Sequence, residues 1–490
     1  MTEMESKLSF FLTDKPLAFS VSHLDSDFLD NMVIMEQVVG TLVKDGSSGV
    51  GPYLAEKWIS SADEKLWTFY LRKNLKCENG EIIDAFSFAR NLKRLLRIYA
   101  KDYAPPVFDH LKGWKDFISG NDAALGIKAV GAEELVFKFE KRPSGFLEFL
   151  SMPYYGYYSD DDFDPSLKWK DNQKIISSGA YKLKDFTNFK VSLEARSGWF
   201  SLNESSPNFA LVQFGSVAEA MEKTDDGEKK HVLISVRDGK NYHAKEFVNF
   251  NSAPTLVTSI VLSPFLEPFD NVEIRKSFRA VVRTLAKNEM GMISDELQRS
   301  NYFYQVLSRY PLNDLSYDVA LANLKKIGPI SLSVFINKLP ADSDLDFVRK
   351  ILSNMETLIG WAFEIYTPES VGEDWVKKSL SNKEFSLRVA RVDAGVAPEN
   401  WVVNMMFCSS MGISFPDPEN RMCKNVLAYD KGEIVSKEDY WIKVHQAIED
   451  SSSVVPLLRS GFSWLISTHI ITENISPTMN IPRFDQLKLK

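Results

Sequence analysis

Residues 52–96 carry the sequence pattern that most constrains the fold of this chain. A proline-led phrase, Pro52-Tyr-Leu54-Ala55-Glu56-Lys-Trp58, precedes a segment in which apolar and more polar residues alternate. Trp67, Phe69 and Leu71 fall on one side of this alternation, and a period of two residues is typical of a half-buried β-strand. The segment 67–73 is therefore predicted to be a strand with one face in a core.

A turn and a helix are predicted directly after this strand. Asn79-Gly80 is a strong turn signal because both residues tolerate positive φ. Asp84 can cap a helix by accepting a hydrogen bond from the backbone. The apolar residues beyond it form one helical stripe: Phe88, Leu92, Leu95, Leu96 and Tyr99.

The rest of the chain alternates between predicted strands and helices. Residues 8–43 open as a strand and then a helix that Asp27 or Asp30 can cap, and Asp270 or Asn271 can cap a second long helix. Strands are predicted at 135–139, 175–184, 191–196, 331–336, 361–366, 385–392 and 454–458. Helices are predicted near 344–358 and 373–380, and this alternation indicates βαβ units.

Length and composition narrow the classes of function. The 490 residues are 44% hydrophobic and 25% charged, which is typical of a globular chain with two or three domains. The net charge of −8 argues against a nucleic-acid partner. No apolar run reaches the ~20 residues that a membrane span needs.

Cysteines and the N-terminus leave the compartment open. The chain has Cys77, Cys408 and Cys423; the last two either form a disulfide or remain free, buried thiols. The N-terminal segment is acidic and leads into a short apolar stretch at 8–12, unlike a secretory signal. Either a signal was removed and an initiator Met added, or the protein is cytosolic.

Taken in order, these phrases resemble the peptide/nickel-type solute-binding proteins of ABC importers, bacterial extracellular solute-binding protein family 5. That family carries a Pro-x-Leu-Ala-Glu-x-Trp phrase, a Thr-Phe-x-Leu-Arg strand, a glycine turn and an Asp-starting helix. Pro268-Phe269-Asp270-Asn271 is similar to its Pro-Phe-Asp-Asp phrase, and Val454-Val-Pro456-Leu457-Leu458 to its Ile-Pro-Leu strand. Ser178-Gly179-Ala180 stands where the family has Thr-Gly-Pro, so that match is partial.

The resemblance implies an α/β fold: a two-lobe periplasmic-binding-protein clamshell of the class II type, with an extra α+β domain inserted in the first lobe. Lobe I would be discontinuous, with residues 1–50, 173–257 and 466–490. The extra domain would be residues 51–172, and the second ligand-binding lobe would be residues 258–465.

Patterns that would indicate catalysis or a bound metal are weak. The glycine-rich segment 46–51 lacks the ending of a phosphate loop and is expected to be a loop that leads to Pro52. None of the six histidines pairs at metal-ligand spacing, so we expect no metal site and no cofactor. The acidic run Asp160-Asp161-Asp162 is expected to be a solvated loop rather than an acid–base pair. No catalytic residue is predicted.

One candidate ligand site follows the strand at 385–392. In peptide-binding relatives the corresponding stretch reads Trp-x-x-Asp-Tyr-x-Asp-Pro, and its first Asp meets the α-ammonium of the peptide. Asp393 is the nearby acid that can fill this role, since a cleft that closes on a cation must supply a carboxylate. It lies five residues before Pro398 where the family has four. The alternative is that Asp393 is a loop or cap residue.

The remaining candidate ligand residues rest on the same resemblance. Trp401, Asn404 and Phe407 fall where relatives line the pocket, and an aromatic beside an amide suits a peptide or a sugar. In the first lobe the candidates are Asn31, Met32, Ser178, Gly179 and Tyr181. For each, the alternative is a structural role in core packing or in a turn.

The resemblance therefore implies a periplasmic or cell-surface receptor, with its signal peptide or lipid anchor removed. It would be a monomer that holds a peptide or another small solute between two lobes and presents it to an ABC permease in the membrane. Closure would be a population shift, because the ligand contacts both lobes only in the closed state. The alternatives are an intracellular or envelope sensor or scaffold, and a binder of oligosaccharide or metal chelate.

Overall fold

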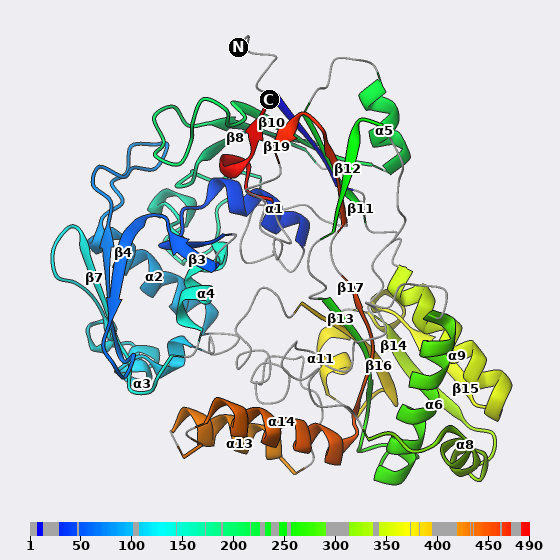
Figure 1. Ribbon diagram of the computed structural model, residues 1–490. Coiled ribbons are helices and arrows are strands. Elements are labelled where there is room, and N and C mark those ends of the chain that lie inside the picture. Colours follow the sequence, from blue (N-terminus) through cyan, green and yellow to red (C-terminus); the bar gives the residue numbers. More distant parts are fainter. Residues whose placement is uncertain are drawn as a thin grey trace. The chain divides into compact units, whose positions relative to one another are not determined.

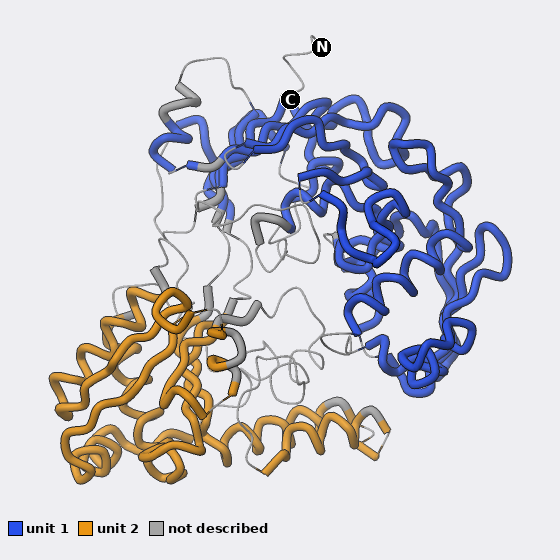
Figure 2. The backbone as a smooth tube through the Cα atoms, turned by 180° about the vertical axis from the view of Figure 1, so that it is seen from behind, with its two compact units in different colours: residues 1–253, 462–490 blue, residues 254–461 orange. Residues whose placement is uncertain are grey.

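The computed structural model has two compact units, residues 1–253 with 462–490 and residues 254–461 (Figure 2). The structure describes residues 7–12, 29–46, 49–100, 107–143, 145–171, 173–187, 190–215, 217–225, 231–236, 245–251, 256–290, 313–336, 343–372, 374–381, 383–393, 419–431, 433–434, 436–460, 463–471 and 482–490. Because the chain leaves the first unit and later returns to it, this unit is built from segments far apart in sequence.

A seven-stranded mixed sheet organises the first unit (Figure 1). Its strands, in spatial order, are β12 (Phe247–Asn251), β18 (Ser463–Ser467), β11 (His231–Val236), β1 (Lys7–Leu12), β10 (Phe209–Phe214), β9 (Lys190–Ala195) and β8 (Tyr181–Thr187). The central strand β1 is parallel to both of its neighbours, and the other pairs are antiparallel. Since β18 comes from the returning segment, the sheet is complete only when both parts of the unit are present.

The pattern at 52–96 folds as predicted, within a four-stranded antiparallel sheet. The strands, in spatial order, are β4 (Ala55–Ser60), β5 (Leu66–Leu71), β7 (Glu134–Lys138) and β6 (Ile127–Ala129). Trp67 and Phe69 of β5 are buried, and their rings lie 5.6 and 5.9 Å from that of Phe146 in α4 (Phe146–Ser151). Alternation along β5 therefore does place one face in a core.

Helix α2 (Ala85–Tyr99) begins at the predicted cap. The side chain of Asp84 accepts a hydrogen bond from Ser87 N at 2.7 Å, and Ser87 Oγ accepts one from Asp84 N at 2.9 Å. This reciprocal arrangement is a capping box, which satisfies two backbone donors that a helix start leaves free. Gly80, in the predicted turn, has a φ of 90°.

Shorter elements complete the first unit. The helices are α1 (Leu29–Val38), α3 (Trp114–Ile118), α5 (Val217–Asp225) and the 3₁₀ turns η1 (Phe108–His110), η2 (Asp122–Ala124), η3 (Pro153–Tyr155), η4 (Asp160–Asp162) and η6 (Phe484–Gln486). Two small antiparallel pairs are β2 (Val43–Gly46) with β3 (Gly49–Pro52), and β19 (Ile470–Ile471) with β20 (Lys488–Leu489). The loop expected at 46–51 is thus in part a hairpin, because Gly46 and Gly49–Gly51 belong to its strands.

The second unit is built on a five-stranded mixed sheet. Its strands, in spatial order, are β15 (Ala362–Tyr366), β14 (Ser331–Ile336), β16 (Leu387–Asp393), β13 (Leu256–Leu262) and β17 (Val454–Ser460). The helices are α6 (Val272–Met290), α8 (Tyr317–Lys325), α9 (Ser343–Ile359), α10 (Pro368–Val371), α11 (Trp375–Leu380), α13 (Arg421–Asp430) and α14 (Lys437–Ser451). The segment β14–α9–β15 joins two parallel strands, which confirms a βαβ unit.

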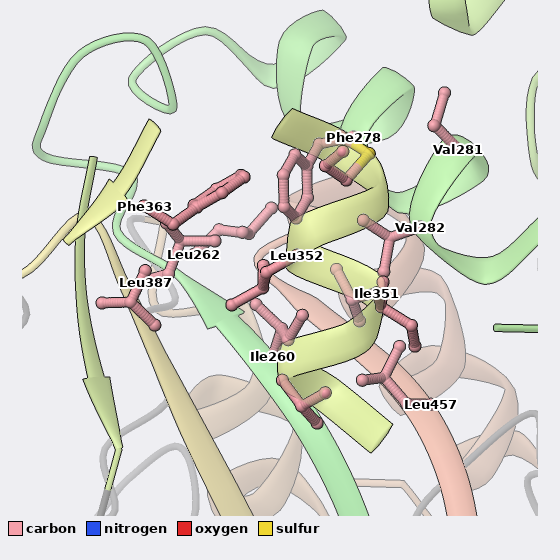
Figure 3. Packing of buried hydrophobic residues seen from close by; sticks show 14 of the residues in the cluster. Ile260, Leu262, Phe278, Val281, Val282, Ile351, Leu352, Phe363, Leu387 and Leu457 are labelled. Carbon is pink, nitrogen blue, oxygen red and sulfur yellow. The ribbon is translucent and has the colours of Figure 1, made fainter. Parts of the chain in front are cut away.

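Helices α6, α8 and α9 pack together, with α6 on β17 and α9 on β15, and the core of the second unit lies beneath them (Figures 1 and 3). Asn271 caps the start of α6 by accepting a hydrogen bond from Glu273 N at 2.9 Å. Phe278 of α6 stacks on Trp361, with ring centroids 6.2 Å apart. Figure 3 shows Leu352 of α9 among the aliphatic side chains of the sheet. Burying each such side chain contributes roughly 1.5–3 kcal/mol.

Within the described residues, none of the helices combines the length and apolar character needed to cross a membrane.

Candidate functional site

The loop at 177–179 contains two of the predicted ligand residues, Ser178 and Gly179. It caps the C-terminal end of α1. The backbone amides of Ser178 and Gly179 donate to the carbonyl oxygen of Val38 at 3.0 and 2.8 Å. Ser177 Oγ donates to the same oxygen at 2.9 Å. The last carbonyls of a helix lack partners within the helix, so this loop satisfies one of them.

Ser178 and Gly179 are both packed against neighbouring backbone. Ser178 is fully buried, and its Oγ accepts a hydrogen bond from Gly40 N at 2.9 Å. A Cβ atom at Gly179 would lie 2.6 Å from Gln37 O and 2.7 Å from Val38 C. Only glycine allows this close approach, because any side chain would have to displace α1.

Tyr181, at the start of β8, is buried beside this loop. Its hydroxyl donates to Pro207 O at 2.9 Å, and its ring lies 6.1 Å from that of Phe484. Burial raises the pKa of Tyr181 well above its ordinary value, and Asp485 adds to the effect. The phenol is therefore a neutral hydrogen-bond donor inside the unit.

Helix α1 carries the other two candidates of the first unit. Asn31 and Met32 lie in its N-terminal half, and Met32 is half-buried. Val33, Ile34 and Met35, which follow, are fully buried. Met32 thus lies in the N-terminal half of α1, and the loop at 177–179 contacts the C-terminal end of the same helix.

The candidates of the second unit are only partly described. Asp393 is the last residue of β16 and lies opposite Leu256 of β13 in the ladder. Trp401, Asn404 and Phe407 lie outside the described residues. The ligand contacts predicted for all nine residues stay predictions.

Four charged residues that sequence reasoning missed meet beside α1, and we call them the C-terminal ion cluster: Glu36, Lys44, Arg483 and Asp485. Lys44 Nζ lies 2.9 Å from Glu36 Oε1, and Arg483 lies 2.9 Å from Asp485 Oδ2 and 4.0 Å from Glu36 Oε1. Both cations also lie over the ring of Tyr53, at 4.5 and 5.2 Å from its centroid. The cluster joins α1, β2 and the C-terminal segment.

Burial and charge act against each other in this cluster. Burial lowers the pKa of Lys44, and the nearby charge of Glu36 only partly offsets this. Burial alone would raise the pKa of Asp485, but Arg483 and Lys44 outweigh it and lower that pKa. Asp485 also accepts a hydrogen bond from Ser201 Oγ at 2.6 Å. The carboxylate of Asp485 is therefore held in its ionised form.

Gln37 makes a second connection between α1 and the C-terminal segment. Its Nε2 donates to Pro482 O at 2.8 Å and to Val33 O at 2.9 Å, and its Oε1 accepts from Phe484 N at 2.8 Å. Gln37 is buried, and these bonds satisfy both ends of its amide.

A faint signal for these residues exists in the sequence. Gln37 and Lys44 interrupt an apolar segment, and Arg483 and Asp485 are two residues apart near the C-terminus. Polar residues on an otherwise apolar face need partners, but which segment supplies them is set by the fold.

The sequence suggested that the acidic run at 160–162 is a solvated loop. The structure shows that only part of this run is exposed to solvent. Asp160 is half-exposed and pairs with Arg90 and Arg94, whereas Asp162 is buried. Asp162 Oδ1 accepts from Ile176 N at 3.0 Å, and its Oδ2 has no hydrogen-bond partner among the described residues. Burial raises the pKa of Asp162 to about 7.

In the part of the chain that the structure describes, no group of three or more His, Cys, Asp and Glu side chains is arranged to hold a metal ion. Cys77 is a free, buried thiol, and burial raises its pKa. Cys423 of α13 is disulfide-bonded. The third cysteine, Cys408, lies outside the described residues.

Comparison with known proteins identifies the class to which this fold belongs. The structure of Haemophilus influenzae OppA in complex with RPPGFSPFR is similar with a TM-score of 0.74 over 99% of both chains, at 16% sequence identity. A Bacillus anthracis oligopeptide ABC transporter substrate-binding domain gives a TM-score of 0.75 over 98% of both chains, at 16% identity. The chain therefore has the α/β fold of the peptide-binding proteins of ABC transporters, which confirms the predicted fold class.

Sequence comparison names the family. Residues 49–282 match the family model for bacterial extracellular solute-binding proteins, family 5 Middle. The periplasmic oligopeptide-binding protein OppA of Salmonella typhimurium is 30% identical over 161 residues, which are 32% of this chain and 30% of OppA. The nickel-binding periplasmic protein of Escherichia coli is 41% identical over 68 residues, 14% of this chain and 13% of that protein. The chain is thus similar to the family 5 solute-binding proteins over just under half of its length, and its sequence matches to these two relatives span less than a third of their length.

Proposed function

We propose that this protein is an extracytoplasmic receptor that binds a peptide or peptide-like solute and delivers it to an ABC permease. The observation that carries the proposal is the match of 99% of the chain to a structure solved with a bound peptide. Peptides suit such a receptor because backbone hydrogen bonds can hold them whatever their side chains are. No bond is made or broken in this function.

The predicted ligand residues are divided between the two units: Asn31, Met32, Ser178, Gly179 and Tyr181 in the first, and Asp393, Trp401, Asn404 and Phe407 in the second. A ligand that joins contacts from both units would stabilise the state in which all of them are made. Its differential affinity for that state limits how far it can shift the population.

The disulfide at Cys423 supports the proposed location. Disulfides form and persist in oxidising compartments such as the periplasm, and they are rare in the cytosol. Relatives such as OppA of Salmonella typhimurium are described as periplasmic. A removed signal peptide or lipid anchor, and a monomeric state, complete the proposal.

The first experiment is purification without denaturation, followed by native and then denaturing mass spectrometry. We expect a discrete bound mass or a ladder of short peptides. An equimolar library of di- to pentapeptides would then be offered beside oligosaccharides and nickel chelates. Retention of a sugar or a chelate in place of peptides would identify a different solute. A protein that retains none of the three classes and shows no thermal shift would favour a sensor or scaffold.

Asp393 has a sharper test of its own. Asp393→Asn should weaken binding of a free-amino peptide by about tenfold to a hundredfold, because a buried ammonium would lose its carboxylate. The same peptide with an acetylated N-terminus should bind wild type and variant alike. Glu384→Gln, at an exposed acid just before β16, is the matched control and should leave both affinities unchanged. Equal affinities of wild type and Asp393→Asn for the free-amino peptide would assign Asp393 to a structural role.

A further inference from the structure

Helix α1 is held at three consecutive residues near its C-terminal end, each by a different part of the first unit. Glu36 pairs with Lys44 of β2, and Gln37 bonds to the backbone of the C-terminal segment. The carbonyl oxygen of Val38 accepts hydrogen bonds from the loop at 177–179. A shift of α1 along or about its axis would break contacts with all of these segments at once.

Stability by itself does not explain the C-terminal ion cluster, because burying charged side chains costs free energy. Removing charges from water carries a penalty that their mutual attraction often only balances, and apolar replacements of similar volume can be equally stable. The side chains of Lys44, Arg483 and Asp485 are nonetheless almost fully buried, at 2%, 9% and 3% exposure. Directional bonds between buried charges and amides define one arrangement, whereas apolar contacts tolerate sliding.

The C-terminal end of α1, which these contacts hold, lies about one helical turn from the residues predicted to contact the ligand. Glu36 lies four positions after Met32, about 6 Å along a helix. Since α1 is a continuous helix from Leu29 to Val38, the position of Glu36 and Gln37 determines the position of Met32.

We infer that Glu36 and Gln37 are positioning residues for the ligand: they fix α1 against the C-terminal segment so that its first half is presented to the solute in one place. The inference rests on the proposed function and on the ligand contacts predicted for Asn31 and Met32. It makes the C-terminal segment a determinant of affinity.

Two variants and a control test this inference. Glu36→Gln removes the charge that faces Lys44 and keeps the shape, and Gln37→Met removes the amide bonds and keeps the length. Val212→Ala, a truncation at a fully buried position of β10, destabilises the same unit without removing an ion pair or a hydrogen bond of α1. The probe is the peptide that wild type retains best from the di- to pentapeptide library. Its dissociation constant is measured by calorimetry at a temperature where near-ultraviolet circular dichroism shows every variant folded.

The expected result is a dissociation constant raised about tenfold in Glu36→Gln and Gln37→Met, with Val212→Ala within about twofold of wild type. Hydrogen exchange of the α1 amides should be faster in the two variants than in the control. If both variants bind as tightly as Val212→Ala, the inference is overturned and the proposed function stands. If wild type itself retains no peptide, the proposed function fails and takes the inference with it. Should Gln37→Met not fold, Glu36→Gln carries the test.

Discussion

Asp162 shows, at the scale of a single residue, how burial changes the chemistry of a carboxylic acid. It is the last residue of an acidic run, and its neighbour Asp161 is exposed. Among the described residues its Oδ2 lacks a partner, so the charged form has lost its water without full replacement. This is why its pKa rises to about 7.

The pH dependence of stability follows from that shift. The pKa of Asp162 is raised in the fold, from 3.8 to about 7, so its ionisation opposes folding. The penalty is absent below pH 4, grows as the pH rises to 7 and is complete above 7. Asp162→Asn cannot ionise and should be more stable than wild type at pH 8, by about 1–3 kcal/mol.

Chemical denaturation of wild type and Asp162→Asn at pH 5 and pH 8 measures this difference. The gap between the two proteins should widen as the pH rises. Asp161→Asn, at the exposed neighbour, should follow the wild-type pH profile. A gap that stays constant from pH 5 to pH 8 would show that Asp162 does not titrate in this range.

At the scale of the element, the start of α2 is determined by local sequence. Asp84 and Ser87 form a capping box within four residues, so a pattern in the sequence is enough to place the helix start. Asp84→Ala should cost about 1 kcal/mol of unfolding free energy, since the backbone amide of Ser87 loses its acceptor.

Denaturation at neutral pH checks this value. Glu133→Ala, which removes an exposed ion pair with Lys73, is the control and should change stability by less than about 0.5 kcal/mol. Equal effects of the two substitutions would contradict a specific role for the cap.

Gly179 shows the opposite case, because the requirement for glycine just before β8 is set by α1, which is distant in the sequence. A Cβ atom there would collide with the backbone of α1, whereas at Gly131 it would meet no atom within 4 Å. Gly179→Ala should therefore destabilise the first unit by about 1–3 kcal/mol, and Gly131→Ala should have little effect. Thermal unfolding of both variants is the measurement. A Gly179→Ala protein as stable as Gly131→Ala would mean that α1 moves away at no cost.

At the scale of the whole molecule, the disulfide at Cys423 links stability to the compartment. Reduction should lower the unfolding free energy by about 2–4 kcal/mol, because the reduced chain gains conformational freedom when unfolded. The experiment uses Cys77→Ser, which removes the free thiol, with and without dithiothreitol. An unchanged unfolding midpoint after verified reduction would show that the disulfide does not stabilise the fold.

The features that the sequence predicted correctly are those that depend on residues close together in the chain. The strand β5, the cap of α2, the cap of α6 at Asn271 and the β14–α9–β15 unit each depend on residues close together in the chain. Their periodicity and capping chemistry are readable without the fold. The family phrases in the same segments led to a resemblance that the family-model match over residues 49–282 confirms.

The surroundings of the candidate site could not be predicted in this way. Glu36 meets Arg483 across more than four hundred residues, and Asp162 is buried although Asp160 and Asp161, which precede it, are exposed. No local pattern specifies such contacts, because they depend on which segments the sheets bring together.

The sequence by itself determined many of the elements, the α/β class and the resemblance to a family, since these follow from periodicity, capping and short phrases. Only the tertiary structure decided which charges are buried, which glycine has no room for a side chain and how the last residues hold α1. The physical reason is that burial and hydrogen-bond partnership are properties of the packed chain: a residue acquires them from segments that its own neighbours in sequence do not include.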